Sequence, residues 1–342
     1  MPTPTPEAAA AKAAKAALAR TLRERVSLWA DLDAELGKLI DQALATIVAQ
    51  LAAAPTDYQQ WVLPRLAAGI QQIADAMAAS AATKASGGLR QAWQLGLDLV
   101  DHPVAQADAA MAALRAAPGL DLLPLPIVGL GVPSLTQLRA LQAVNTHQIT
   151  GASSDLVNAI NRQLGQVVLG VQSPHQAMQA VATLMPDRTK NQVRGIVTTN
   201  LGTAFNTASF ESLKAQAKRD PKIKKQWRRS GKLHSRWNHD LADGQVQEVE
   251  TPFELHGERG GTVTLMYPAD PAAPVGEVIH CGCVVLPWKA SWKMHTPAKL
   301  AFTPAEIKAK REAAAEREGK RLATRPKTRP KTPVGARSRT KP

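Results

Sequence analysis

The chain has 342 residues with a net charge of +14; 44% of its residues are hydrophobic and only 4% are aromatic. This length is enough for two domains, and the abundance of Ala with few aromatics predicts helices that pack through small side chains. No run of 18 apolar residues is present, so we expect no transmembrane helix and no membrane partner. Two cysteines and the absence of a signal peptide predict synthesis in a reducing cytoplasm and exclude a disulfide-rich secreted class.

Residues 1–118 are predicted to be helical, because apolar residues recur at helical spacing from Leu18 to Ile40. Pro55 and the pair Gly87-Gly88 are predicted to interrupt this region, with shorter helices following up to Ala116. The helices are expected either to form an ordinary bundle or to serve as an extended arm that binds a partner. The Leu-, Pro- and Gly-rich residues 119–133 are predicted to be a linker, either a buried connector or a segment that lies in a partner's groove.

Residues 134–224 are predicted to be a second helical part. Helix starts are expected at Ser134, at Ser153–Asp155, at Ser173-Pro174 and at Asp187, because hydroxyl and carboxylate side chains cap helices and Pro suits the first helical position. The last of these helices is expected to be long and to end near Ala217.

Residues 225–292 are predicted to be a small module, mostly of antiparallel strands, which makes the whole chain α+β. Asp243-Gly244 is a hairpin-type dipeptide, and residues 245–249, 262–267 and 278–286 have the β-branched or alternating pattern of short strands. A unit with so few core residues often needs an additional stabilising cross-link, which we call a staple.

That staple could be a metal ion. Cys281 and Cys283 are two residues apart, so in a strand they present two thiolates on one face. A zinc ion takes four Cys or His ligands in most structural sites, and His239 with His280 are the candidate complement; His256 and Asp243 are further options. The alternative is a pair of buried core thiols with His239 as a hydrogen-bonded surface residue. A disulfide between the two cysteines is not expected, because one intervening residue makes it strained.

Two basic segments are candidate DNA contacts. Residues 214–232 contain nine Lys or Arg against one acidic residue, and they either bind phosphates or form a solvated helix end and linker. Residues 293–342 are predicted to be a largely disordered basic tail, since residues 308–342 carry +10 of the net charge and are rich in Pro towards the end. The tail either binds DNA without sequence preference or serves solubility. The DNA-binding candidates are Lys224, Lys225, Arg228, Arg229, Arg325, Lys327, Arg329, Lys331, Arg337 and Arg339.

One ordered set of residues resembles a known family. The set is Arg236, His239, Asp243, Gly244, Phe253, Cys281 and Cys283. It resembles the C-terminal domain of phage minor head proteins of the phage Mu F type, also called head morphogenesis proteins. The resemblance extends in order over residues 134–288 and is specific from Arg236 onward. It implies a non-enzymatic component of the virion, at the portal vertex inside the capsid, that assists assembly and DNA packaging or ejection. The implied partners are the portal protein, the major capsid protein and double-stranded DNA.

Two other functions compete with this interpretation. His234, Asn238 and His239 beside basic residues are loosely similar to His-metal nucleases, in which a histidine activates water and a metal holds phosphate. A non-catalytic DNA-binding factor would use the basic tail alone. No Gly-rich phosphate loop and no H-E-x-x-H motif is present.

Overall fold

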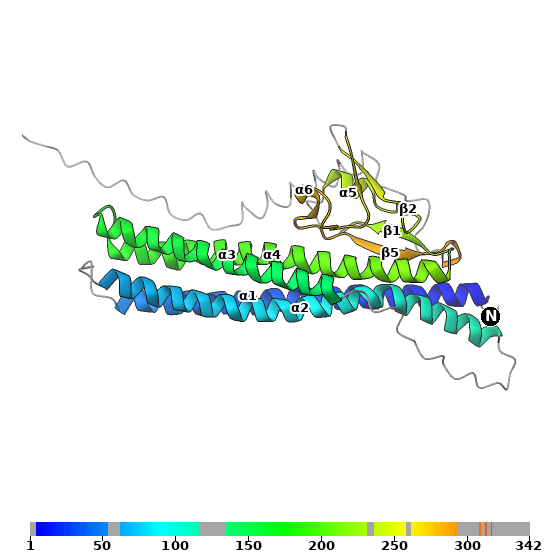
Figure 1. The fold of residues 1–342 in the computed structure, drawn as a ribbon, viewed down its shortest axis with the longest axis horizontal. Coiled ribbons are helices and arrows are strands. Elements are labelled where there is room, and N and C mark those ends of the chain that lie inside the picture. Colours follow the sequence, from blue (N-terminus) through cyan, green and yellow to red (C-terminus); the bar gives the residue numbers. More distant parts are fainter. Residues whose placement is uncertain are drawn as a thin grey trace, which may run out of the picture.

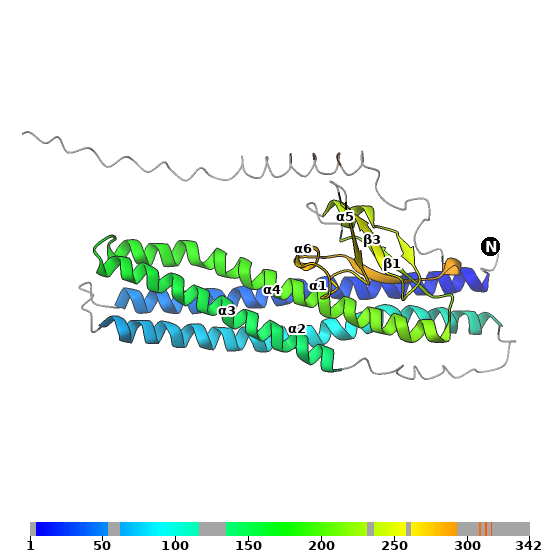
Figure 2. The ribbon, with the colours of Figure 1, turned by 45° about the horizontal axis from the view of Figure 1, so that its top comes forward.

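The computed structural model describes residues 5–53, 62–115, 135–230, 236–257 and 261–292, together with residues 308, 312 and 316. Four long helices make up most of this part: α1 (Pro6–Ala53), α2 (Val62–Arg115), α3 (Leu135–Val168) and α4 (Pro174–Arg219). They lie side by side as an elongated bundle, in which α2 and α4 each contact the other three helices (Figures 1 and 2). A small module of strands and short helices sits against one side of the bundle (Figure 1).

The helices form because apolar side chains recur on one stripe of each, as for Leu36, Ile40 and Ile47, which are all buried in α1. Burial of each such side chain contributes about 1.5–3 kcal/mol. The buried side chains of the bundle and of the module belong to one continuous cluster. The module therefore rests on the bundle through a shared core.

By length and apolar composition, one described helix, α1, could cross a membrane. A core helix of a soluble protein has the same profile, and the stripe from Leu32 to Leu51 of α1 is buried in the bundle. In the apolar window of α1, 28% of the residues are buried, so the helix combines a buried stripe with an exposed face.

The helices are longer than the sequence predicts. The expected interruption at Gly87-Gly88 is wrong, because α2 continues through both residues. A Cβ on Gly88 would lie 2.6 Å from Leu32 Cδ2, and a Cβ on Gly96 would lie 2.2 Å from the carbonyl oxygen of Phe205. Glycine at these two positions permits close approach of α2 to α1 and α4, and tertiary packing overrides the weak helix propensity of glycine.

Two predicted helix starts are also wrong. α3 runs unbroken through Ser153, whose hydroxyl donates to the carbonyl of Ala74 in α2 rather than capping a helix. α4 runs through Pro186 and Asp187 without a new start. The start at Ser173-Pro174 is confirmed: Ser173 caps α4, its side chain accepts from the backbone N–H of Gln176, and the Gln176 side chain accepts from the backbone N–H of Ser173.

The module confirms the α+β class. Strands β2 (Val246–Gln247), β1 (Lys224–Arg228) and β5 (Val284–Trp288) pair antiparallel in that order, and β3 (Phe253–His256) pairs with β4 (Thr262–Leu265). Three short helices complete the module: α5 (Trp237–Leu241), α6 (Val275–Val278) and η1 (Ala290–Trp292). The turn at Asp243-Gly244 is confirmed, with Gly244 at φ 86° and its N–H donating to the carbonyl of Trp227.

Candidate metal centre

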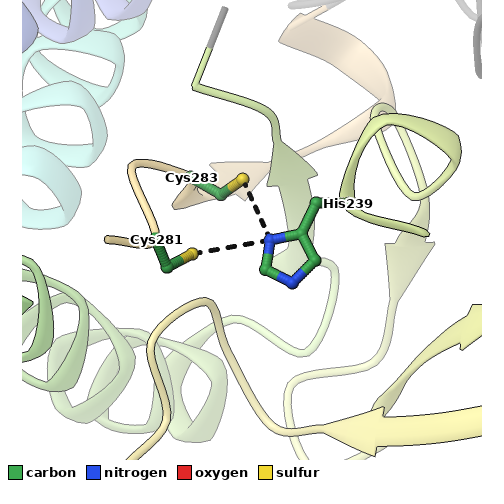
Figure 3. A group of neighbouring side chains, drawn as sticks. All are labelled: His239, Cys281 and Cys283. Atoms are coloured by element: carbon green, nitrogen blue, oxygen red, sulfur yellow. Dashed lines mark hydrogen bonds between the residues drawn. The ribbon is translucent and has the colours of Figure 1, made fainter. Parts of the chain in front are cut away.

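The structure brings His239, Cys281 and Cys283 together inside the module. His239 lies in α5, and the two cysteines flank Gly282 on the segment between α6 and β5. The Nδ1 atom of His239 is 3.6 Å from the sulfur of Cys281 and 3.6 Å from the sulfur of Cys283 (Figure 3). All three side chains are buried. This His–Cys–Cys cluster could hold a metal ion, because its three donor atoms lie within 4.8 Å of one another.

The orientation of the His239 ring is fixed from the opposite side. Its Nε2 lies 2.7 Å from Oε2 of Glu277, and the amide of Asn238 donates to the other oxygen of that carboxylate at 3.0 Å. A carboxylate accepts a proton but has none to give when ionised, so this contact favours the tautomer with hydrogen on Nε2. In that neutral tautomer the lone pair on Nδ1 faces the two sulfur atoms, whereas a doubly protonated imidazole donates Nδ1–H to a thiolate. Such a carboxylate–histidine pair is the usual outer support of a metal-binding histidine.

Trp227 closes the cluster on another side. Its ring meets the His239 ring edge to face at 5.2 Å and the Phe253 ring at 5.4 Å, and both Trp227 and Phe253 are fully buried. Trp227 comes from β1, a strand that the sequence reading missed because its Lys and Arg residues suggested a basic linker. The signal that was present is Gln226-Trp227 between charged residues, a pattern too short to identify a strand.

The two thiols share one proton easily. The pKa of Cys281 is lowered to about 4, chiefly because the Cys283 thiol donates a hydrogen bond to it and further because of His239, while burial opposes the change. The same hydrogen bond and burial raise the pKa of Cys283 well above its ordinary value. Of the two thiols, Cys281 is therefore the one that ionises first. Burial also lowers the pKa of nearby Arg25 to about 10, an effect that both cysteines oppose.

The remaining predicted ligands lie elsewhere. His280 is exposed, its backbone N–H donates to the hydroxyl of Thr199, and it is not part of the cluster, which corrects its assignment as a ligand. His256 is exposed and contacts Thr262. Asp243 accepts a hydrogen bond from the backbone N–H of Arg229. Its carboxylate also forms an ion pair with the guanidinium of Arg229 at 3.3 Å. Asp243 is thus a turn residue and no member of the cluster.

The other family-motif residues surround the cluster. The Arg236 guanidinium donates to the carbonyl of Ile279, two residues before Cys281, and so ties α5 to the cysteine segment. Gly244 makes the turn after α5, and Phe253 packs under Trp227. Arg236, His239, Cys281 and Cys283 therefore lie together, while Asp243 contacts Arg229, and Gly244 and Phe253 contact Trp227 beside the cluster. Glu277 and Asn238 also belong to this site. They are identified only by their contacts in the folded structure, which the sequence does not show.

The structure changes the assignment of the basic residues around β1. Lys225 is fully buried, with Nζ donating to the carbonyl of Met266 at 2.6 Å and lying 4.8 Å from the Phe253 ring. It cannot contact a phosphate in this fold, so its assignment as a DNA contact is wrong. Lys224 is paired with Glu248, and Arg228 and Arg229 are paired with Asp243. The basic charge of β1 is mostly compensated within the module.

Other predicted features lie outside the described residues. These are the linker 119–133, His234 and the tail residues Arg325, Lys327, Arg329, Lys331, Arg337 and Arg339.

Comparisons with known proteins identify one relative and no family. No family model matches the chain, and no solved structure matches it. Over 154 residues the chain is 30% identical to "Uncharacterized protein YqbB" of Bacillus subtilis (strain 168). The match covers 44% of this chain and 45% of the relative, so the chain spans less than half of the relative's length. The relative's name states no function.

Proposed function

We propose that this protein is a phage minor head protein: a structural component of the virion at the portal vertex inside the capsid. It would assist head assembly and DNA packaging or ejection without catalysis. The observation that carries the proposal is that resemblance residues lie together: His239, Cys281 and Cys283 form a buried cluster, and Arg236 donates to the carbonyl of Ile279, two residues before Cys281. Residues that match a family motif by chance would not be expected to meet in space.

The same proposal includes zinc as the ion of the His–Cys–Cys cluster. A tetrahedral zinc with Zn–S bonds of about 2.3 Å and a Zn–N bond of about 2.0 Å holds nitrogen and sulfur ligands about 3.5 Å apart. Both Nδ1–sulfur distances are 3.6 Å, and the histidine already presents the lone pair that a metal needs. Two thiolates and an imidazole are a donor set that suits zinc. No fourth His, Cys or carboxylate of the described residues joins the cluster, so one position of a tetrahedral ion is left for another ligand.

A bound zinc ion would stabilise the folded module by linking two of its segments. The module has only short strands, of two to five residues, and a small unit of this kind gains much of its stability from a bound metal. The ion would join α5 to the segment before β5, two parts of the module that are far apart in sequence. A dication would also supply the charge that favours ionisation of the second thiol.

The placement of His239 weakens the nuclease alternative. A general base must have a ring nitrogen free to take a proton from water. In His239 one nitrogen meets Glu277 and the other faces both sulfur atoms, and the residue is buried. The site is therefore better suited to binding a metal ion than to hydrolysing a phosphodiester. In the minor head role, the long bundle would contact portal and capsid subunits, and the basic tail would contact double-stranded DNA.

The role is tested by mass spectrometry of gradient-purified particles from a lysate that carries the surrounding genes. We expect this chain at a few copies per particle together with the portal protein. Its absence from particles, with recovery in a free nucleic-acid-bound fraction, would refute the virion role and favour the DNA-binding factor. The metal is tested separately, by elemental analysis of the full chain purified without a metal-affinity step; about one zinc per chain is expected.

A further inference from the structure

The cysteine segment is held by the bundle at four successive residues. The backbone N–H of His280 donates to the Thr199 hydroxyl at 3.1 Å. The carbonyl oxygen of Cys281 lies so close to Gly202 that a Cβ there would be 3.2 Å away. The carbonyl oxygens of Gly282 and Cys283 accept from Arg25 at 3.3 Å and from Asn206 at 3.0 Å.

Three of these contacts come from one face of α4. Thr199, Gly202 and Asn206 are three and four residues apart, so they line up along the helix. Asn206 is fully buried and also accepts from the backbone N–H of Val285 at 3.0 Å, so it satisfies both a donor and an acceptor of the incoming strand. The main chain that presents the two sulfur atoms is therefore shaped by the bundle.

The fourth contact comes from α1. The Arg25 guanidinium lies 4.9 Å from the Trp29 ring and 5.0 Å from the Phe205 ring, which limits its movement. From there it reaches the peptide between the two cysteines. The guanidinium thus donates to the Gly282 carbonyl from a position packed against two aromatic rings, while its buried Nε has no hydrogen-bond partner among the described residues.

We infer that Arg25 is a positioning residue of the metal centre: by holding the Gly282 carbonyl it keeps the two cysteine sulfurs turned towards His239. The inference rests on the proposed metal site and adds a role for a residue 257 positions away in the chain. The metal centre is then completed by three parts of the protein: α5 supplies the histidine, the segment before β5 supplies the sulfurs, and α1 with α4 sets the geometry of that segment.

The test compares zinc binding by the full chain and three variants, measured by competition with a chromophoric chelator. Arg25→Met removes the donor, Arg25→Lys keeps a charged donor on a flexible stem, and Arg20→Met is the control on an exposed part of the same helix. Loss of an outer contact weakens metal binding by about 10–100-fold. We expect a loss in this range for Arg25→Met, a smaller loss for Arg25→Lys and wild-type binding for Arg20→Met.

A second readout separates positioning from general destabilisation. In the Co²⁺-loaded protein, the absorption that arises from sulfur–cobalt charge transfer reports the placement of the sulfur atoms. It should change in Arg25→Met and stay unchanged in Arg20→Met. If Arg25→Met does not fold, the nearly isosteric Thr199→Val takes its place, since it removes the neighbouring hydrogen bond to His280.

The outcomes distinguish the two ideas. Wild-type zinc affinity and an unchanged cobalt spectrum in a folded Arg25→Met would overturn the role of Arg25, and the same result in Thr199→Val would overturn the role of α4 in shaping the segment; both results would leave the metal site in place. A wild-type chain that binds neither zinc nor cobalt, and behaves as a Cys281→Ser, Cys283→Ser variant does, would overturn the metal site itself and the inference with it.

Discussion

His239 and Glu277 form a hydrogen bond of 2.7 Å on the side of the imidazole ring that faces away from the two cysteine sulfurs. When the carboxylate accepts a hydrogen bond from Nε2–H of the neutral imidazole, the opposite nitrogen, Nδ1, carries the lone pair. This bond would therefore orient His239 for the metal binding proposed above.

Replacing Glu277 should weaken zinc binding. Glu277→Leu removes the acceptor and is expected to lower zinc affinity about 10–100-fold. Glu277→Gln keeps an acceptor oxygen and should lose less. Chelator competition measures both, with Glu254→Gln, an exposed carboxylate in β3, as the control. Equal affinity of Glu277→Leu and the wild type would show that the carboxylate does not support the ligand.

The double variant Cys281→Ser, Cys283→Ser should bind no zinc and unfold at a lower temperature. A ligand present at a thousand times its dissociation constant stabilises the native state by about 4 kcal/mol. Thermal unfolding with and without a strong chelator isolates the metal's part of this change. The chelator should lower the midpoint temperature of unfolding of the wild type and leave that of the variant unchanged. A wild type that is indifferent to the chelator would make the cysteines ordinary core residues.

Because of Lys225, the free energy of unfolding should increase at alkaline pH. Burial lowers the pKa of Lys225 from 10.5 to about 8 in the folded state. Below pH 8 both states hold the proton and the cost of burying the charge is fully present. Between about pH 8 and 10.5 the unfolded state binds more protons, so stability rises with pH by at most about 3 kcal/mol.

Urea unfolding of the wild type and of Lys225→Met at pH 7 to 10 measures this effect. The stability of Lys225→Met relative to the wild type should fall as pH rises, because the variant has no charge to lose. A constant difference across this range would show that Lys225 titrates normally.

Gly96 and Gly87 should respond in opposite directions to alanine. A Cβ on Gly96 would collide with the Phe205 carbonyl at 2.2 Å, so Gly96→Ala should destabilise the bundle by about 1–3 kcal/mol or more. Nothing lies within 4 Å of a Cβ on Gly87, so Gly87→Ala should stabilise α2 by about 0.5–1 kcal/mol. Chemical unfolding of the pair measures both, and a destabilised Gly87→Ala would contradict the continuous helix through Gly87-Gly88.

Removal of residues 323–342 should leave the fold intact and weaken DNA binding. This segment carries seven Lys or Arg and no acidic residue. Each lost phosphate contact lowers the dependence of binding on salt, so both the affinity and the salt slope on duplex DNA should fall. A full-length variant with these seven residues changed to Gln controls for length. Retention of the truncated protein on DNA equal to that of the wild type would remove the tail from the DNA contact.

The sequence predicted those parts of the site that are close together in the chain or carry a distinctive residue type. The C-x-C pair and His239 were identified by residue type, but the strand expected over residues 278–286 begins only at Val284, so both cysteines lie before it. The Asp243-Gly244 turn was identified from turn chemistry. Glu277 and Arg25 could not be identified, since their roles depend on which helix packs beside the cysteine segment. Long-range packing also explains the uninterrupted α2, in which glycine serves close helix contact.

The contact between Arg25 and Gly282 places constraints on when the site can be built. During synthesis α1 leaves the ribosome long before the cysteine segment, with 257 residues between the two partners. The hydrogen bond between them can form only when α1 and the cysteine segment are packed against each other. If the cluster binds a metal as proposed, a fully shaped metal centre would exist only in chains whose N-terminal helix and C-terminal module have packed together.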